Sequence, residues 1–335
     1  MIIETKSYPR AAVIGNPSDG YYGKTIAFVF SNFAAKVQLY HTPELEIIPA
    51  ELDTTRFLSL NYLVEDVNLH GYYGGERLLK ATIKVFADYC RQNNIKLDDR
   101  NFTIRYSSDI PHRLGLAGSS AIITACMKAL MAFYDISIPK PLLANLVLSV
   151  EVNELGITAG LQDRVAQVYE TPVFMDFNEE NMKKNGFGIY KMLDVKLFQN
   201  FYIAYRNDQS EGSEVLHNNL KARFQIGEQK VVDAMKEWAG LTEQFYKALQ
   251  NNNIELMHEL MNHNFDLRRS LVEITPKNLE MVDVARSVGA SAKFTGSGGA
   301  IIGTYSNENA YMELQRLLNG KGIEILKPKI CGYEN

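Results

Sequence analysis

The chain has 335 residues, of which 46% are hydrophobic and 22% are charged, and this composition is typical of a globular protein rather than a disordered one. That length exceeds what one ordinary hydrophobic core accommodates, so it favours two domains. The formal net charge is −4 and no block of five basic residues occurs, which argues against a nucleic-acid-binding surface.

Membrane insertion and export are also disfavoured. No apolar run approaches the roughly 18 residues of a membrane span, and the first ten residues, MIIETKSYPR, lack the charged-then-apolar layout of a signal peptide. Cys90, Cys126 and Cys331 lie far apart in the sequence, which suits reduced thiols better than a disulfide or zinc framework. We therefore expect a cytoplasmic protein with no membrane partner.

The first 180 residues mix short strands with helices. Residues 10–15, 25–30 and 35–41 are rich in β-branched and aromatic side chains, which predicts strands. Residues 75–90 and the segment that starts at Pro141 carry apolar side chains at helical spacing, which predicts helices.

The character of the sequence changes after a polar stretch at residues 178–186. We therefore predict two domains, at residues 1–185 and 186–335. Strands separated by helices in both parts indicate α+β architecture. The elements predicted in the second part are a strand at 201–205, long helices between about 214 and 288, a strand–loop–strand at 291–305, a helix at 308–318 and a strand at 323–326.

The segment IPHRLGLAGSSA, residues 110–121, leads directly into a helix that ends near Tyr134. Glycines at 115 and 118 remove side chains that would keep an anion away from the backbone. Ser119 and Ser120 stand where a helix N-cap is expected. Such a junction directs free N–H groups and the positive end of a helix dipole at one point, which favours a phosphate. The alternative is a capped helix after a flexible glycine loop.

A second motif is EVNELGITAGLQDRVAQVYE, residues 151–170. Asp163 follows a Gly-x-Gln turn, so its carboxylate could orient or deprotonate a hydroxyl, or it could simply cap a helix. Glu151 and Glu154 lie three residues apart, which places them on one face of a helix. Either glutamate could bind a hard cation such as Mg²⁺, although a solvated surface pair is the simpler interpretation.

A third motif, KFTGSGGA, covers residues 293–300. Three glycines and two hydroxyl residues between predicted strands indicate either a tight turn or a loop whose backbone packs against the phosphate loop.

Two further patterns are rejected. GYYGKT at residues 20–25 ends like a Walker A loop, but two residues rather than four separate its glycines. HELMNH at residues 258–263 resembles a metalloprotease zinc helix, but its histidines are five apart and fall on different faces.

Together the motifs resemble those of the GHMP small-molecule kinases. YPRAAVIGNPSDGYYG resembles the first motif of that family, IPHRLGLAGSSA its phosphate loop, and KFTGSGGA its third motif, in the family's order. The resemblance implies a two-domain α+β fold, with an N-terminal domain like ribosomal protein S5 domain 2 and a ferredoxin-like C-terminal domain. It also implies an ATP-dependent kinase that uses Mg²⁺.

Four longer strings resemble the glucuronokinase branch of the family, namely NPSDGYYGKTIAF, AGLQDR, HNNLKARFQIGE and LMNHNFDLRRSL. This resemblance implies phosphorylation of the anomeric hydroxyl of D-glucuronate. Kinases of a neutral hexose, another uronate, a heptose derivative or mevalonate remain alternatives, as does a non-catalytic regulator on the same fold. The intact Asp163, Ser120 and loop glycines argue against the regulator. The sequence does not predict the oligomeric state.

The resemblance also assigns roles. Asp163 falls on the catalytic aspartate, Arg10 on the arginine that opens the first motif, and Ser120 on the Mg²⁺-binding serine. Glu151 is the better match for the Mg²⁺-binding glutamate and Glu154 is the alternative. The predicted nucleotide-binding residues are Pro111, Gly115, Leu116, Ala117, Gly118, Ser119, Ser120, Ala121, Gly296, Ser297 and Gly298. The predicted substrate-binding residues are Asp19, Tyr22, Gly160, Asp163 and Gly298.

In the first motif, Asn16-Pro17-Ser18-Asp19 stands where galactokinases carry Glu-His-Thr-Asp, which disfavours galactose while keeping the aspartate that grips a sugar hydroxyl. A sugar carboxylate would require a cationic partner. Among the cations of the glucuronokinase-like strings and the phosphate loop, we consider five for this role, Lys24, Arg113, Arg223, Arg268 and Arg269.

Overall fold

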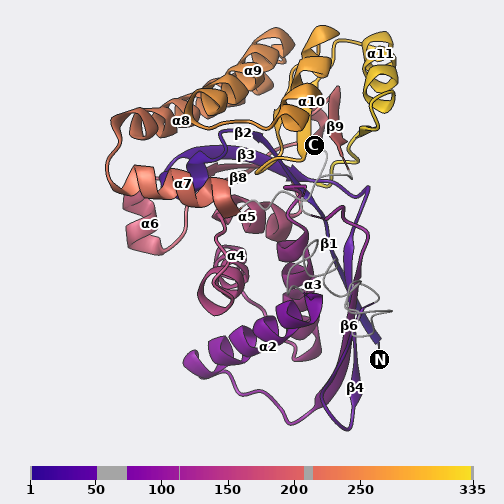
Figure 1. Cartoon of the computed structure of the whole chain (residues 1–335). Helices are drawn as coiled ribbons and strands as arrows, with labels where there is room; N and C mark the ends of the chain where they lie inside the picture. The colour runs from indigo at the N-terminus through magenta and orange to yellow at the C-terminus, as the bar shows by residue number, and fades with distance from the viewer. Residues whose placement is uncertain (1, 51–73, 113, 207–213, 333–335) are drawn as a thin grey trace, which may run out of the picture. The chain divides into compact units, whose positions relative to one another are not determined.

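The computed structural model describes residues 2–50, 74–112, 114–206 and 214–332. Contacts between Cα atoms divide the chain into two compact units (Figure 1). Unit 1 comprises Met1–Tyr8, Phe33–Ile110 and Gly118–Ala159, and unit 2 comprises Pro9–Asn32, Pro111–Ala117 and Gly160–Asn335. The units therefore interleave along the sequence. The boundary at 185/186, which divides the chain into consecutive halves, stays a prediction.

Unit 1 is built on a four-stranded sheet in the order β1-β4-β6-β5. Its strands are β1 (Ile2–Ser7), β4 (Ala35–Thr42), β5 (Glu46–Ile48) and β6 (Asn101–Ser108). All pairs are antiparallel except β5 with β6. Ala35, Val37 and Leu39 are fully buried and alternate with more exposed residues. This period of two places one face of the sheet on the core.

The helices of unit 1 are α2 (Gly75–Gln92), α3 (Gly118–Phe133) and α4 (Lys140–Ser149). Helix α3 packs on β1, β4 and β6, and α2 and α4 pack on α3 (Figure 1). The predicted helix from Pro141 is confirmed as far as Ser149, after which one π-helical turn, Val150–Glu154, follows. That wider turn sets the direction of Glu151, and helical spacing alone does not reveal it.

One sheet of unit 2 has the order β2-β3-β7-β8, with every pair antiparallel. Its strands are β2 (Arg10–Ile14), β3 (Lys24–Val29), β7 (Val173–Asp176) and β8 (Ile189–Met192). All five residues of β2 are buried, because α5 (Leu161–Tyr169), α8 (Gln229–Gln250) and α9 (Ile254–Leu271) pack on it. A register shift lies between Ala12 and Ile14.

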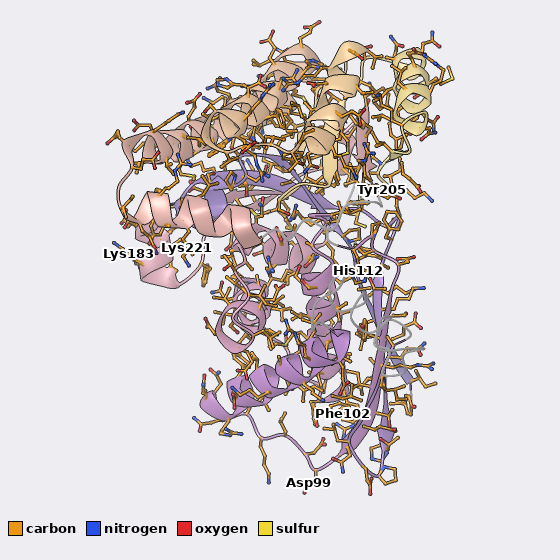
Figure 2. All side chains as sticks on the ribbon, in the orientation of Figure 1. Asp99, Phe102, His112, Lys183, Tyr205 and Lys221 are labelled. Atoms are coloured by element: carbon orange, nitrogen blue, oxygen red, sulfur yellow. The ribbon has the colours of Figure 1, made fainter. Side chains whose placement is uncertain are left out.

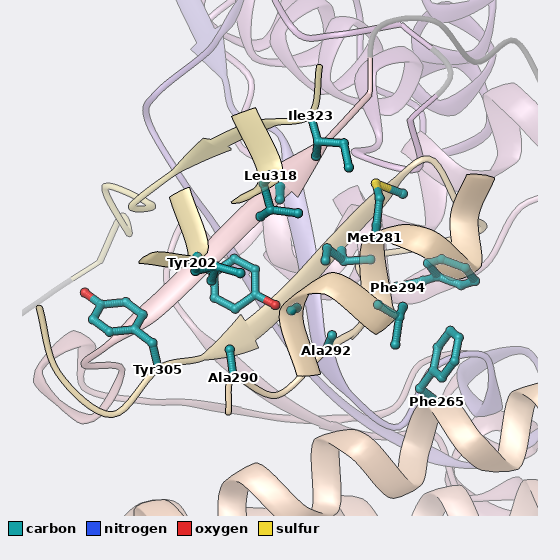
Figure 3. Packing of buried hydrophobic residues seen from close by; sticks show 14 of the residues in the cluster. Tyr202, Phe265, Met281, Ala290, Ala292, Phe294, Tyr305, Leu318 and Ile323 are labelled. Atoms are coloured by element: carbon teal, nitrogen blue, oxygen red, sulfur yellow. The ribbon is translucent and has the colours of Figure 1, made fainter. Parts of the chain in front are cut away.

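A second sheet of unit 2 has the order β10-β11-β9-β12 and is also antiparallel. Its strands are β9 (Phe201–Tyr205), β10 (Lys293–Phe294), β11 (Ala300–Thr304) and β12 (Glu324–Leu326). Figure 3 shows its core, where Met281, Phe294 and Phe265 gather against the strands. Phe265 and Phe294 meet edge to face, with ring centroids 5.3 Å apart. This contact fixes α9 against β10.

Unit 2 contains further helices among its described residues. They are η1 (Ser18–Tyr21), α6 (Glu179–Asn185), η3 (Val195–Leu197), α7 (Glu214–Gln225), α10 (Pro276–Ser287) and α11 (Glu308–Asn319). The predicted strands at 201–205 and 323–326 and the predicted helix at 308–318 are confirmed within one residue at each end. Among the described residues, no helix is both long enough and apolar enough to cross a membrane.

Candidate active site

An ion pair between Arg10 and Asp163 joins the first motif to the second within unit 2. Arg10 opens β2, and Asp163 lies in the first turn of α5. Arg10 Nη2 lies 2.8 Å from Asp163 Oδ1, and the two side chains are 4% and 16% exposed. A charge-assisted bond so far from bulk water is stronger than its surface counterpart. The aspartate is therefore held in one orientation.

A second guanidinium, that of Arg164, reaches the other oxygen of the same carboxylate. Arg164 Nη1 donates to Asp163 Oδ2 at 3.1 Å and to the carbonyl of Gly160 at 2.8 Å. Two cations, one on each oxygen, stabilise the negative charge of the carboxylate. The sequence pattern did not point to Arg164, because consecutive residues of a helix usually point in different directions. Its only signal was its place directly after Asp163.

Asp19 lies in the same unit, against the turn that precedes α5. The backbone N–H and side-chain amide of Gln162 both donate to the Asp19 carboxylate at 3.4 Å. A Cβ atom at residue 160 would collide with Asp19 Oδ2, so this approach requires Gly160. Burial, and then repulsion by Asp163, raise the pKa of Asp19 to about 7. Gly160, Asp19 and Asp163 are thus brought together, and their binding of a substrate stays a prediction.

Tyr22 follows η1 and is 48% exposed, with a left-handed backbone at φ 61°. Its N–H donates to the carbonyl of Ser18 and closes the turn that carries Asp19. The structure therefore places Tyr22 beside a predicted sugar ligand with its ring open to solvent, and its own role stays a prediction.

The part of the phosphate loop in unit 2 packs against the third motif, backbone to backbone. A Cβ atom on Gly115 would lie 2.9 Å from the Ser297 nitrogen, and one on Gly296 would collide with the Gly115 carbonyl. The Leu116 carbonyl accepts from Arg10 N at 3.0 Å. The Ala117 carbonyl accepts from Gln167 Nε2 at 2.9 Å. The packing of the two glycine loops that the sequence offered as one alternative is therefore observed.

The rest of that loop begins α3 in unit 1. Helix α3 starts at Gly118, so Ser119 and Ser120 lie inside its first turn rather than at the N-cap, and the N-cap interpretation was wrong. The residue before the helix, Ala117, has φ 61°, an uncommon backbone conformation for a residue with a side chain. This conformation turns the chain sharply into the helix. Gly118 to Ser120 therefore form the first turn of the helix. His112, labelled in Figure 2, is exposed on the same loop.

A serine hydroxyl and a buried carboxylate lie together in unit 1. Ser119 Oγ donates to Glu151 Oε1 at 2.8 Å, and Glu151 is 1% exposed. Ser120 is the neighbouring buried hydroxyl. Glu154 lies at the surface instead, where its Oε2 is 2.6 Å from Lys84 Nζ. Hydroxyl and carboxylate oxygens suit Mg²⁺, so the residues fit the predicted ion, and the geometry favours Glu151 over Glu154.

The five cations considered for a sugar carboxylate have different surroundings. Lys24 Nζ lies 3.2 Å from Asp176 and also contacts Glu243. Arg223 is paired with Glu228 through two bonds of 2.7 Å. The remaining three are Arg268, which donates to the carbonyls of Gly296 and Ser297, Arg269, which is exposed, and Arg113, which lies outside the described residues. Lys24, Arg223 and Arg268 are therefore committed to bonds within the protein.

Comparison with known proteins bears on these interpretations. The family model for the GHMP kinase N-terminal domain matches residues 77–171, and that for the GHMP kinase C-terminal domain matches residues 245–319. Two Arabidopsis thaliana proteins, probable glucuronokinase 2 and glucuronokinase 1, are each 44% identical to this chain over 90% of its length and 84% of theirs. The chain belongs to the GHMP kinase family.

Solved structures agree on the fold of this GHMP kinase. Lactococcus lactis galactokinase complexed with galactose superposes with a TM-score of 0.76 at 16% identity, covering 100% of this chain and 94% of that one. The mevalonate kinase of Methanococcus jannaschii superposes with a TM-score of 0.70 at 24% identity, covering 100% and 98%. The predicted two-domain GHMP kinase fold is thus confirmed. As a member of this family the chain is an ATP-dependent kinase.

Proposed function

We propose that this GHMP kinase transfers the γ-phosphoryl group of ATP to the anomeric hydroxyl of D-glucuronate and forms glucuronate 1-phosphate. The observation that carries the proposal is the 44% identity with two glucuronokinases over 90% of this chain. The intact Arg10–Asp163 pair at the predicted catalytic position supports turnover rather than a purely regulatory role.

Phosphoryl transfer passes through a loose transition state, so the protein contributes mainly position and charge. In the proposal, the backbone N–H groups from Gly115 to Ser120 hold the phosphates of ATP. Asp163 accepts a hydrogen bond from the anomeric hydroxyl. Since both of its oxygens already face guanidinium groups, we assign Asp163 the orientation of that hydroxyl first and acceptance of its proton late.

The rest of the sugar is assigned to the Asp19 turn. The ionised Asp19 carboxylate accepts from sugar hydroxyls, and Gly160 leaves the space for that carboxylate to approach α5. Tyr22 is the further sugar ligand in the proposal, and Gly298, which the sequence predicts for both substrates, is assigned to the nucleotide loop. Arg10 has a positioning role on Asp163.

Ser120 and Glu151 would hold Mg²⁺, with Ser119 as a second hydroxyl beside the same glutamate. The ion, when bound, neutralises charge on the phosphates. We place the protein in the cytoplasm on the strength of its composition and its separated cysteines.

The test is a coupled ADP-release assay with purified protein, Mg·ATP and a panel of uronates, neutral hexoses, heptose derivatives and mevalonate. We expect turnover with D-glucuronate and phosphate on the anomeric carbon by ³¹P NMR. Phosphate on another carbon, or preference for a different member of the panel, would replace the substrate and leave the kinase assignment intact. Absence of turnover with every acceptor would favour the alternative that the protein is a non-catalytic regulator on the same fold.

A further inference from the structure

Helix α9 carries two buried polar side chains one turn apart. Asn264 is 2% exposed and Arg268 is 3% exposed. Residues four apart lie on the same face of a helix. Both belong to the string LMNHNFDLRRSL, to which the proposed function assigns no role. Their hydrogen-bond partners lie on two different loops of unit 2.

Asn264 binds the first of these loops. Its Oδ1 accepts from the backbone N–H of Gly15 at 2.7 Å, and its Nδ2 donates to the carbonyl of Asn16 at 3.3 Å. The Gly15 carbonyl in turn accepts from the N–H of Ser18 at 2.9 Å, where the turn that carries Asp19 begins. The amide therefore fixes the path of the backbone into the proposed sugar ligand.

Arg268 binds the second loop. Its Nη1 and Nη2 donate to the carbonyls of Gly296 and Ser297 at 2.7 and 2.6 Å. The guanidinium also lies 5.0 Å above the ring of Phe294. Burial lowers the pKa of Arg268 to about 10, which leaves the group cationic at neutral pH. A planar fork that meets two consecutive carbonyls fixes both their spacing and their direction.

The loop that Arg268 holds is the one against which the phosphate loop packs. Gly296 and Ser297 are so close to Gly115 that no Cβ atom fits on Gly115 or Gly296 without displacement. A shift of the Gly296–Ser297 backbone therefore displaces Gly115. Arg268 acts on the predicted nucleotide loop through this contact, without a place in the site itself.

We propose that Asn264 and Arg268 are positioning residues, with Asn264 setting the affinity for the sugar and Arg268 the affinity for ATP. One face of α9 thus holds the two substrate loops separately. The inference rests on the proposed function for the assignment of each loop to a substrate. It also replaces the earlier hypothesis that Arg268 pairs with a sugar carboxylate.

The experiment measures the dissociation constants of Mg·ATP and of D-glucuronate separately by calorimetry. We expect Arg268→Met to weaken Mg·ATP binding at least tenfold and glucuronate binding less than threefold. We expect Asn264→Leu to weaken glucuronate binding at least tenfold and Mg·ATP binding less than threefold. Arg268→Lys keeps the charge but loses the planar pair of donors, so its dissociation constant for Mg·ATP should lie between those of Arg268→Met and wild type. Asn264→Asp keeps the acceptor for Gly15 but loses the donor to Asn16, so its sugar affinity should lie between those of Asn264→Leu and wild type.

Two control variants separate positioning from general loss of stability. Val282→Ala removes volume from the core of the sheet that contains β10 and β11, and it should lower the melting temperature while leaving the ratio of the two constants unchanged. Arg316→Met removes an exposed arginine and should change neither constant. If both constants rise together in the α9 variants, as general destabilisation would produce, or if neither rises, the inference is wrong.

The proposal can still be tested if one variant does not fold or if the protein does not bind glucuronate. If Arg268→Met does not fold, two milder variants replace it: Arg268→Lys, and Phe294→Leu, which removes the ring beneath the guanidinium. Each of them must still weaken ATP binding more than sugar binding. If the wild-type protein binds Mg·ATP but not glucuronate, the proposed substrate fails. The Arg268 part is then still decided by ATP binding, and the Asn264 part by the acceptor that the panel identifies.

Discussion

At the scale of single residues, Asp163 has the most clearly defined surroundings. We expect Asp163→Asn to lower kcat at least about 10²-fold while ATP binding changes little, because an amide cannot accept through two oxygens or take up a proton. The variant also leaves two buried arginines without their shared anion, so its melting temperature should fall.

Asp176→Asn is the matched control for this variant. Asp176 is an 18% exposed aspartate paired with a cation in the same unit, but it lies at the end of β7 rather than beside Arg10. Its kcat should stay within threefold of wild type. Asp163 is structural if Asp163→Asn keeps more than half of the wild-type kcat with chemistry rate-limiting.

Asp19 predicts a pH dependence. Its pKa is raised to about 7, so its ionised, hydroxyl-accepting form is lost as the pH falls through that value. We expect kcat/KM for the sugar to fall about tenfold per pH unit below the inflection, and Asp19→Asn to abolish the inflection. Calorimetric titration of the sugar without ATP excludes the nucleotide as the titrating group. A flat profile between pH 6 and 8 contradicts the prediction.

The raised pKa of Asp19 has the opposite effect on stability: a higher pH favours sugar binding but lowers the free energy of unfolding. A carboxyl whose pKa is raised on folding binds its proton more tightly in the folded state, so the free energy of unfolding contributed by Asp19 falls as the pH rises from about 4 to about 7. The ionised form that the sugar requires is therefore the form that destabilises the fold. This cost is typical of a binding site rather than of a structural ion pair.

The two candidate glutamates for Mg²⁺ predict unequal variants. Glu151→Gln should raise the apparent Mg²⁺ constant at least about tenfold at fixed ATP, because the amide lacks the charge that a magnesium ligand supplies. Glu154→Gln should change it less than twofold, since that glutamate is an exposed partner of Lys84. A larger rise in Glu154→Gln than in Glu151→Gln would reverse the choice of ligand.

At the scale of the elements, the two glycine loops allow almost no added volume. Gly296→Ala places a Cβ atom against the carbonyl of Gly115, so one loop must move. We expect the KM for ATP to rise at least about tenfold. The control is Gly240→Ala in the middle of α8. An added Cβ atom there has no neighbour within 4 Å beyond its own helix, so alanine should stabilise the fold by roughly 0.5–1 kcal/mol. Similar KM values for Gly296→Ala and wild type would contradict the assignment of this loop.

What the sequence predicted at this scale were contiguous motifs and regularly spaced elements. Apart from β7 and β8, which were not predicted, the strands of both sheets in unit 2 belong to that class. Arg164 and Asn264 do not. Asn264 binds a residue 249 positions away, and no local pattern encodes which loop a helix face meets. Helix α3 also begins earlier than predicted, with Ala117 rather than Ser119 or Ser120 before its first residue, because the left-handed Ala117 supplies the turn that the serines were expected to cap.

At the scale of the whole molecule, the substrate depends on how many groups of the sugar find partners. A sugar carboxylate that leaves water requires a charge-assisted bond, worth about 1.5–3 kcal/mol net. Of the five cations first considered, Lys24, Arg223 and Arg268 already bind groups of the protein. Two of that set remain. They are Arg269, which is exposed, and Arg113, which lies outside the described residues.

The last prediction therefore compares matched acceptors on the intact enzyme. D-glucuronamide has the shape of D-glucuronate without its charge, and glucose lacks the carboxyl group altogether. A site built for a charged group rejects analogues that leave its polar partner stranded. We expect kcat/KM for glucuronate to exceed the values for both analogues at least about 10²-fold, and Arg269→Met to narrow the gap only if Arg269 is the partner. Comparable values for glucuronate and glucuronamide would show that no cation reads the carboxylate, and the substrate would have to be sought among neutral sugars.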